Sequence, residues 1–271
     1  ALQSENISYD TMCEYLDELA FLAETAGAET VKIFTQNLDK PVTATFVGKG
    51  KLEEIKNYVE ENEIDLVIFD DELSPTQLRN IERELQGRKV LDRTNLILDI
   101  FAGHAVTGEG KLQVEIAQLK YTSPRLTGKG TALSRQGGTS GSIGARGPGE
   151  TKLETDRRHI SRRIQSLREE LAVLEKERGV KRAKREKTGI PTVAVAGYTN
   201  AGKSTLLNYL TGAGILAENK LFATLDPTVR KLSLPSGREV LLADTVGFIN
   251  KLPHGLVEAF KSTLDEIRYA D

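Results

Sequence analysis

The sequence predicts an α/β protein built in three parts, and three observations along the chain predict it. Residues 1–105 alternate between helical and strand-like apolar patterns, which is typical of a small parallel sheet flanked by helices. Residues 106–189 carry two apolar stripes at helical spacing on either side of a glycine-rich stretch, which predicts an antiparallel helical hairpin. Residues 190–271 begin with an apolar strand pattern, a glycine-rich loop and a helix, which predicts a second α/β domain.

The first part is expected to form a small parallel α/β subdomain. Ser74 followed by Pro75 has the features of a helix start, since serine caps the free backbone N–H groups and proline suits the first turn. Asp70-Asp71 is expected to end a strand on the solvent side. Because the chain begins almost directly with a helix, we expect an opening strand of the sheet to be absent. The predicted elements are a helix over 11–26, a strand over 30–34, a helix over 51–62, a strand over 64–69, a helix from 74 and a strand over 89–91.

The second part is expected to form two long antiparallel helices. Apolar residues spaced by four and three positions occur over 112–119 and again over 153–174, as they do where two helices pack together. Pro124 should end or kink the first helix, because its ring removes a backbone donor and clashes with the preceding turn. The second helix is expected from about residue 151 to 187, on the order of 50 Å at 1.5 Å per residue.

A flexible glycine-rich loop, residues 128–149, is predicted between these helices. It holds eight glycines and the basic residues Lys129, Arg135 and Arg146, with almost no large apolar side chain. Such a segment buries too little surface to offset its ordering entropy, so we expect it to be mobile. It is either a plain linker or a tip that approaches nucleic acid, since glycine lets backbone amides come close to phosphates. The region 120–190 holds 18 Lys and Arg against 8 Asp and Glu, which suits an anionic partner or a solvated helix face.

Composition limits the class of protein. Cys13 is the single cysteine, so no intramolecular disulfide is possible, and this fits a reducing compartment. The sequence has neither the pattern of a signal peptide nor an apolar run of about 18 residues, the length that a membrane helix needs. We therefore expect a cytoplasmic protein without a membrane span.

The strongest motif lies at residues 197–204. Gly-Tyr-Thr-Asn-Ala-Gly-Lys-Ser fits the pattern G-x-x-x-x-G-K-[ST], between the apolar pattern of a buried strand at 191–196 and a helical pattern at 205–210. Glycines let the backbone N–H groups of the loop surround phosphates, and the helix N-terminus favours anions. Lys203 should neutralise the β- and γ-phosphates, and Ser204 should offer its hydroxyl to Mg²⁺. These residues predict a site for a nucleoside triphosphate with Mg²⁺.

A second element further along the chain strengthens this prediction. Asp244-Thr-Val-Gly247 follows another apolar strand pattern and fits D-x-x-G. Asp244 should approach Mg²⁺ through water, and the N–H group of Gly247 should sense the γ-phosphate. Between the two motifs, the segment 222–228 contains Thr224 and Thr228, and the chemistry of either threonine suits a Mg²⁺ ligand when the γ-phosphate is present.

The motifs resemble those of the HflX family of the Obg-related translational GTPases, and the resemblance spans nearly the whole chain. It is carried by Gly-Tyr-Thr-Asn-Ala-Gly-Lys-Ser-Thr (197–205), Phe-Ala-Thr-Leu-Asp-Pro-Thr (222–228), Ala-Asp-Thr-Val-Gly-Phe-Ile (243–249), Arg-Gly-Pro-Gly-Glu-Thr-Lys-Leu-Glu-Thr-Asp-Arg-Arg (146–158) and Glu-Gly-Lys-Leu-Gln-Val-Glu (109–115). The 146–158 motif is specific to this family. The resemblance implies that residues 190–271 are part of a P-loop GTPase domain, preceded by an α/β subdomain and a two-helix subdomain.

The resemblance also implies an activity and partners. Members of the family bind GTP or GDP with Mg²⁺, hydrolyse GTP, bind the large ribosomal subunit and its 23S-type rRNA, and in some cases split stalled or stressed ribosomes. We expect a monomer whose glycine-rich loop reaches the rRNA through Lys129, Arg135 and Arg146. Thr224 is implied as the switch threonine on Mg²⁺, together with Ser204 and, through water, Asp244. The expected nucleotide-binding residues are Gly197, Tyr198, Thr199, Asn200, Ala201, Gly202, Lys203, Ser204, Thr205, Phe222, Ala223, Thr224, Leu225, Asp226, Asp244, Thr245, Val246 and Gly247.

Two features depart from a standard GTPase. Phe248 stands where Ras-like enzymes place a glutamine that orients water, so no catalytic residue is assigned and hydrolysis should be slow until a partner arranges the site. The guanine-reading Asn-Lys-x-Asp motif is absent, since neither 219–222 nor 250–253 ends in Asp. We expect that the chain is cut off before this motif, and that as it stands it binds nucleotide weakly, with little preference for guanine and little activity.

Two other functions remain open on the residues alone. One is an RNA-binding or RNA-remodelling protein that uses ATP, and the other is a scaffold that acts without nucleotide. Gly48-Lys49-Gly50-Lys51 precedes a helix and fits either a simple turn or a second phosphate site. Competition between nucleotides separates these functions, because ATP that displaces GTP poorly is not the main substrate.

Overall fold

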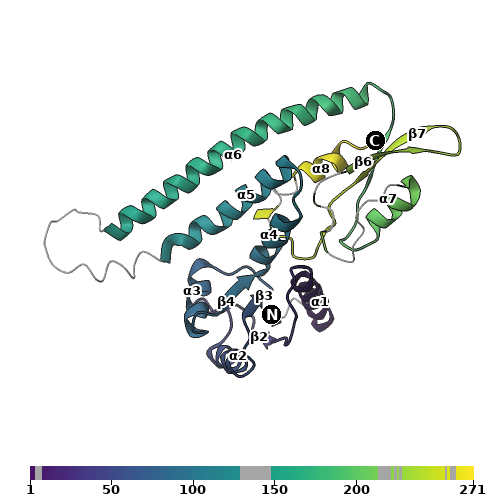
Figure 1. Ribbon diagram of the computed structural model, residues 1–271. Coiled ribbons are helices and arrows are strands. Elements are labelled where there is room, and N and C mark those ends of the chain that lie inside the picture. Colours follow the sequence, from purple (N-terminus) through teal and green to yellow (C-terminus); the bar gives the residue numbers. More distant parts are fainter. Residues whose placement is uncertain are drawn as a thin grey trace. The chain divides into compact units, whose positions relative to one another are not determined.

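The protein is described by a computed structural model (Figure 1). The structure describes residues 1–3, 8–128, 148–212, 221–222, 225, 228–253, 255–256 and 261–271. The chain divides into two compact units. Unit 1 comprises Ala1–Ala20, Glu29–Leu96 and Leu119–Gln165, and unit 2 comprises Phe21–Ala28, Ile97–Gln118 and Ser166–Asp271.

Unit 1 contains the predicted small α/β subdomain. Its elements are β1 (Leu2–Gln3), most of α1 (Tyr9–Thr25), β2 (Gln36–Asn37), α2 (Lys49–Glu61), β3 (Leu66–Phe69), α3 (Pro75–Glu84), β4 (Lys89–Asp92) and the start of α4 (Arg93–His104). β1 pairs with β2, and β3 pairs with β4, in both cases parallel as predicted. Eleven buried apolar residues of unit 1, from its strands, helices and loops, form one core.

The strand predicted over 30–34 is wrong. The strand in this region is β2, and it pairs with β1, so the expectation that an opening strand is absent is wrong as well. Val31 and Ile33 are 59% and 43% exposed. β-branched residues favour a strand only where a neighbouring strand and a packed face receive them. Phe34 of this segment packs against the core, but no strand pairs with residues 30–34 among the described residues.

Helix α3 begins as the sequence predicts. The Ser74 hydroxyl accepts a hydrogen bond from the Gln77 backbone N–H at 3.2 Å, and the Gln77 side chain accepts one from the Ser74 N–H at 3.0 Å. Pro75 occupies the first helical position. This reciprocal capping box satisfies two backbone donors that the helix itself leaves free, and it fixes the residue at which the helix starts.

The expectation that Asp70 faces solvent is also wrong. Asp70 is 2% exposed, and its Oδ1 lies 3.6 Å from Nη1 of Arg93, whose side chain is itself buried. Arg93 also pairs with Glu18 of α1 at 2.7 Å. Burying a single carboxylate is costly unless an opposite charge compensates for it, and Arg93 supplies that charge at the end of the adjacent strand.

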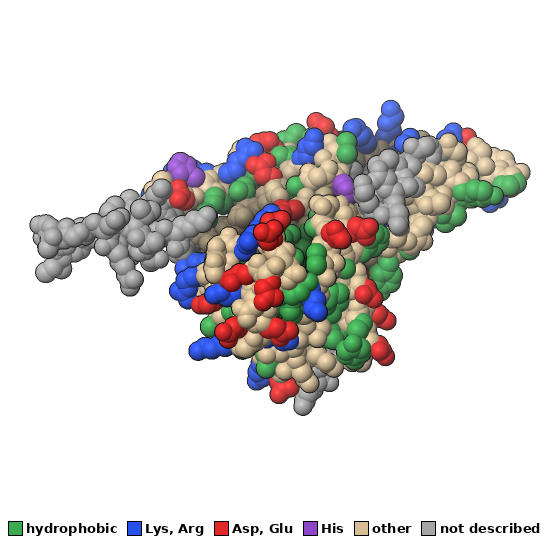
Figure 2. All heavy atoms as spheres, turned by 60° about the horizontal axis from the view of Figure 1, so that its bottom comes forward, with side chains coloured by type: hydrophobic (Ala, Val, Ile, Leu, Met, Phe, Trp, Pro, Cys, Tyr) green, Lys and Arg blue, Asp and Glu red, His purple; other side chains and the backbone are tan. Residues whose placement is uncertain are grey.

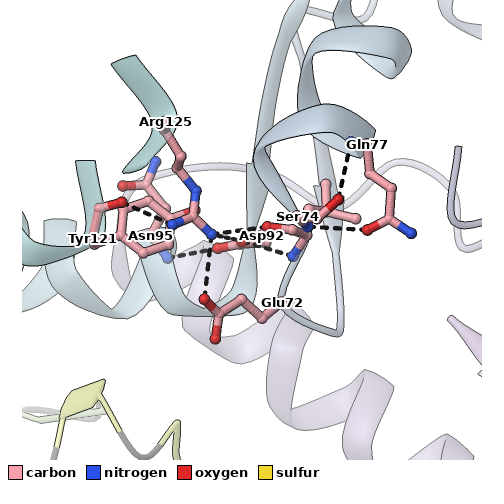
Figure 3. A network of polar contacts seen from close by, with 8 residues as sticks. Glu72, Ser74, Gln77, Asp92, Asn95, Tyr121 and Arg125 are labelled. Atoms are coloured by element: carbon pink, nitrogen blue, oxygen red, sulfur yellow. Dashed lines mark hydrogen bonds and ion pairs between the residues drawn. The ribbon is translucent and has the colours of Figure 1, made fainter. Parts of the chain in front are cut away.

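A second polar network lies within unit 1, between residues 121–125 and the α/β subdomain. Figure 3 shows Arg125 reaching Asp92 and Glu72, with Nη2–oxygen distances of 3.5 and 3.3 Å. The same nitrogen donates to the Leu73 carbonyl oxygen at 2.8 Å, and the guanidinium carbon lies 3.4 Å from the centre of the Tyr121 ring. Burial, with the nearby charge of Asp92, raises the pKa of the Tyr121 phenol, so the hydroxyl keeps its proton.

The hairpin prediction is confirmed in its helices. The elements are α5 (Gly108–Thr122), a 3₁₀ turn over Ser123–Gly128 and α6 (Pro148–Glu186), so α5 ends just before Pro124 as expected. Within unit 2, Arg178 of α6 lies 3.1 Å from Glu109 of α5. Residues 129–147, most of the predicted glycine-rich loop, lie outside the described residues.

In the described residues of 190–271, unit 2 contains a three-stranded sheet and two α-helices. Its elements are β5 (Thr192–Val195), α7 (Lys203–Thr211), β6 (Thr228–Ser233), β7 (Glu239–Asp244) and α8 (Lys261–Arg268). The strand order is β5-β7-β6, with β5 parallel and β6 antiparallel to β7. The prediction of a buried first strand is wrong in its burial, because β5 is an edge strand of this sheet and Val193 is 45% exposed. In the part of the chain that the structure describes, no helix has the length and apolar character to cross a membrane.

Candidate nucleotide-binding site

The two predicted motifs begin at the same edge of the sheet. β5 and β7 are parallel neighbours, and Val195, which precedes the first motif, is in register with Asp244, which starts the second. The carboxyl ends of parallel strands are where loops of open α/β sheets place ligands. Thr245 is 1% exposed, and its hydroxyl donates to the Val195 carbonyl oxygen at 2.7 Å, which fixes the two strand ends together.

The loop over 197–204 has the backbone shape that a phosphate cradle needs. Asn200 and Gly202 adopt positive φ angles of 58° and 81°, and Gly202 caps the N-terminus of α7. Lys203 Nζ donates to the Tyr198 carbonyl oxygen at 2.6 Å, so the ammonium group lies across the loop. Burial lowers the pKa of Lys203, and the negative charge of Asp244 opposes that shift. Phosphate oxygens would supply the anionic partner that this partly desolvated cation favours.

Two predicted metal-binding side chains lie in direct contact. The Ser204 hydroxyl donates to Oδ2 of Asp244 at 2.6 Å, and Oδ1 of the same carboxylate accepts from the Thr245 N–H at 3.0 Å. Asp244 is fully buried, so its orientation is fixed by these contacts. A hydroxyl and a carboxylate are the oxygen donors that Mg²⁺ prefers. The donor set therefore fits the predicted metal.

The second motif pairs with the first through its backbone. The Phe248 N–H donates to the Gly197 carbonyl oxygen at 3.0 Å, and the Thr199 N–H donates to the Phe248 carbonyl oxygen at 2.8 Å. Gly247 lies so close to the loop that a Cβ atom there would be 2.4 Å from the Thr199 Cα. Only glycine fits this approach, which brings the predicted γ-phosphate sensor against the phosphate loop.

The remaining predicted residues are distributed as follows. The two switch threonines differ, because Thr224 lies outside the described residues whereas Thr228 starts β6 in register with Asp244. The Thr228 hydroxyl is buried without a hydrogen-bond partner among the described residues. Phe222, Leu225 and Val246 are buried, and Thr205 is exposed. The predicted residues outside the described ones are Ala223, Thr224, Asp226, Lys129, Arg135 and Arg146.

Sequence reasoning missed contacts from the N-terminal region. The Phe222 ring packs against Phe101 of α4 with centroids 4.8 Å apart, and the Leu221 N–H donates to the Thr25 hydroxyl at 3.2 Å. Leu221 is separated from Thr25 by 196 residues, and no periodicity or motif relates positions so far apart. The signal that could have found them is the large apolar side chain of Phe222 two residues before the predicted switch threonine.

The segment 48–51 is the start of α2, with Gly48 at the N-cap and Lys49 as the first helical residue. The Gly48 N–H donates to the Gln36 side chain at 2.9 Å, and Lys51 pairs with Glu54 at 2.6 Å. These two groups are therefore engaged within the chain. Acidic and basic side chains are intermixed on the face of the α/β subdomain that Figure 2 turns forward. Neither observation favours a second nucleotide or RNA site here.

Comparison with known proteins gives consecutive matches along the chain. Residues 13–102 match a family model described as GTP-binding GTPase N-terminal. Residues 104–185 match one described as GTP-binding GTPase Middle Region. Residues 192–270 match one described as 50S ribosome-binding GTPase. A protein named GTPase HflX from Caldanaerobacter subterraneus subsp. tengcongensis is 63% identical over 258 residues, which cover 95% of this chain and 59% of that protein. The chain belongs to the HflX family. The GTPase HflX of Escherichia coli (strain K12) is 50% identical over 96% of this chain and 60% of its own length.

Two solved structures of GTP-binding proteins are similar to this chain. The crystal structure of SsGBP and GDP complex matches all of this chain and 68% of that chain, with a TM-score of 0.54 and 30% identity. A GTP-binding protein from the hyperthermophilic archaeon Sulfolobus solfataricus in complex with GDP matches with a TM-score of 0.51 and 31% identity, over all of this chain and 67% of that one. The chain spans about 60% of the length of the curated HflX relatives named above.

Proposed function

We propose that the full-length protein is a Mg²⁺-dependent GTPase that acts on the large ribosomal subunit. The observation that carries the nucleotide half is the contact between the Ser204 hydroxyl and the Asp244 carboxylate at the mouth of the phosphate loop. Ser204 and Thr224 would bind Mg²⁺ directly, and Asp244 would bind it through water. The metal neutralises phosphate charge when it is bound, and Lys203 adds a second positive charge on the β- and γ-phosphates.

Guanine nucleotides are the preferred ligands in this proposal. The support is the GDP in the two solved structures similar to this chain, together with family models whose descriptions name GTPases. The residues that read the base are not among the motifs of this chain, so guanine preference has to be measured on the full-length protein.

Hydrolysis by the protein alone should be slow. Phe248 is 38% exposed beside the phosphate loop, and its ring has no atom that can orient a water molecule by hydrogen bonding. A partner must therefore supply or arrange the group that positions water. The ribosome is the proposed partner, because the family model over 192–270 is described as a 50S ribosome-binding GTPase. A ribosomal partner also places the protein in the cytoplasm.

Nucleotide titration of the full-length protein tests the proposed Mg²⁺-dependent binding of guanine nucleotides. We expect a GTP analogue to bind more tightly with Mg²⁺ than without it, and ATP to compete poorly. Asp244→Asn keeps the side-chain shape but removes the charge, and it should abolish the Mg²⁺ dependence. Asp65→Asn is the matched control, because the Asp65 side chain is 97% exposed. Equal competition by ATP, or Mg²⁺ dependence that survives in Asp244→Asn, would contradict the proposal.

Cosedimentation with large ribosomal subunits tests the proposed ribosomal partner. Arg135→Glu with Arg146→Glu reverses two charges in the glycine-rich segment, and it should weaken binding in a salt-dependent way if these residues contact rRNA phosphates. Arg79→Glu on α3 is the control for charge reversal at an exposed arginine elsewhere. Unchanged binding of the double variant removes the role of this segment. Failure of the wild-type protein to bind the subunit in any nucleotide state removes the ribosomal partner itself.

A further inference from the structure

Thr228 is the first residue of β6, and it lies directly opposite Asp244 in the antiparallel pairing of β6 with β7. The side chains of directly opposed residues project from the same face of a sheet, with Cβ atoms about 5 Å apart. The Thr228 side chain therefore lies on the face that carries the Asp244 carboxylate. Because Asp244 accepts a hydrogen bond from Ser204 of α7, Thr228 borders the pair of side chains that forms the predicted Mg²⁺ site.

The Thr228 hydroxyl differs from the other two hydroxyls near these strand ends. The Ser204 hydroxyl donates to Asp244 at 2.6 Å, and the Thr245 hydroxyl donates to the Val195 carbonyl oxygen at 2.7 Å. The Thr228 Oγ1 atom is buried, and it has no hydrogen-bond partner among the described residues. A hydroxyl buried in this way destabilises a fold, because it gives up its hydrogen bonds to water. Such groups commonly receive an ordered water, an ion or a functional contact.

The strand itself does not require a hydroxyl at position 228. Valine has the same branched shape at Cβ as threonine, and both residue types favour strands. Valine follows directly at position 229 of β6. Within the described part of the chain, the hydroxyl of Thr228 therefore contributes no hydrogen bond to the fold, and its use lies in binding.

The neighbouring carboxylate supplies that use. In the proposed function Asp244 binds Mg²⁺ through water, so a water molecule must be oriented beside its carboxylate. Two polar side chains without a direct hydrogen bond are joined nearly as well by a bridging water. A threonine hydroxyl both donates and accepts, so it can orient such a water. Groups that orient the ligands of a metal in this way contribute substantially to metal affinity.

We propose that Thr228 is a positioning residue of the Mg²⁺ site, whose hydroxyl binds the water through which Asp244 contacts the metal. This inference rests on the proposed function. Asp244 is oriented by Ser204 and Thr245 without any γ-phosphate, so the role of Thr228 is the same with GDP and with GTP. A switch threonine differs, because it contacts the metal only when the γ-phosphate is present.

Mg²⁺ titrations of the full-length protein test this role. Thr228→Val keeps the shape of the side chain and removes its hydroxyl. We expect the variant to need about ten times more Mg²⁺ for half-maximal tightening of nucleotide binding, as is usual when a group that orients a metal ligand is lost. The increase should be equal with GDP and with a non-hydrolysable GTP analogue, and nucleotide affinity in EDTA should not change. Thr228→Ser keeps a hydroxyl and should restore most of the Mg²⁺ affinity.

Thr94→Val is the matched control. Thr94 is 4% exposed in unit 1, and its hydroxyl is likewise buried without a partner among the residues that the structure describes. Each substitution removes a buried polar atom that no hydrogen bond compensates, so neither should lower the Tm of the nucleotide-free protein. Only Thr228→Val should raise the Mg²⁺ requirement. A purely structural role of Thr228 would do the reverse, with a lower Tm and an unchanged Mg²⁺ requirement.

The outcomes separate this inference from the proposed function. An unchanged Mg²⁺ requirement in Thr228→Val, a loss confined to the GTP analogue, or a Thr228→Ser variant that behaves like Thr228→Val would each overturn the positioning role. Thr228→Ala carries the same expectation if Thr228→Val does not fold. Mg²⁺ dependence that is lost in Asp244→Asn but intact in Thr228→Val refutes this inference alone. Wild-type protein without Mg²⁺ dependence for either nucleotide refutes the proposed function.

Discussion

Replacement of Gly247 by alanine tests the pairing between the two nucleotide motifs. The new Cβ atom would lie 2.4 Å from the Thr199 Cα and 2.5 Å from the Thr199 backbone nitrogen, distances that no rearrangement of a flexible side chain can relieve. The backbones must separate, and the hydrogen bonds that Phe248 makes with Gly197 and Thr199 must break or lengthen. At about 1 kcal/mol net for each bond, the pairing loses about 2 kcal/mol.

Amide hydrogen exchange on the nucleotide-free protein measures this loss. About 2 kcal/mol corresponds to roughly a thirtyfold increase in the open population, so the amides of Phe248 and Thr199 should exchange roughly thirtyfold faster in Gly247→Ala. Gly50→Ala in α2 is the control, because no atom lies within 4 Å of a Cβ atom built there. If these two amides exchange equally fast in wild type and Gly247→Ala, the close approach of the two motifs does not exist in solution.

Two further predictions concern charge. Because burial lowers the pKa of Lys203 below the ordinary value of 10.5, its uncharged fraction at alkaline pH exceeds that of an exposed lysine. Its charged form therefore opposes folding, and stability should rise with pH between the lowered pKa and 10.5. Amine-reactive labelling of Lys203 should slow when a bound nucleotide raises its pKa; labelling that GTP leaves unchanged would place the phosphates elsewhere. Arg178 forms ion pairs with Glu109 and Asp265 at 3.1 and 2.7 Å, and 16% of its side chain is exposed. Arg178→Met should therefore lower the free energy of unfolding, measured by chemical denaturation, by about 3 kcal/mol. Lys176→Met is the control, and because Lys176 is exposed it should lower that free energy little. A loss no larger than that of Lys176→Met would show that these pairs contribute nothing net.

Elements whose signal is local were predicted from the sequence. The start of α3 was predicted from Ser74 and Pro75, because a helix cap involves only residues within one turn. The end of α5 before Pro124 has the same origin, since proline acts on the turn that precedes it. Both predictions depend on contacts a few residues apart, and tertiary packing did not override either one.

Predictions that depended on a partner from elsewhere were less successful. β-branched residues at 30–34 suggested a strand, but the pairing partner, Leu2–Gln3, lies in register with Gln36–Asn37. Asp70 was expected in solvent, yet Arg93 compensates its charge in the interior. In both cases the residue types were compatible with two environments, and the position of a distant residue decided between them.

The sequence by itself determined which chemistry is predicted for the site. The order of strand, glycine loop and helix predicts the phosphate loop, and the residue types of Lys203, Ser204 and Asp244 predict charge neutralisation and Mg²⁺ binding, because these roles depend on functional groups and short spacings. Only the tertiary structure decided that Ser204 and Asp244 touch, through the parallel pairing of β5 with β7. It also decided that Phe101 holds Phe222, since a contact between residues far apart in the chain leaves no periodic trace in the sequence.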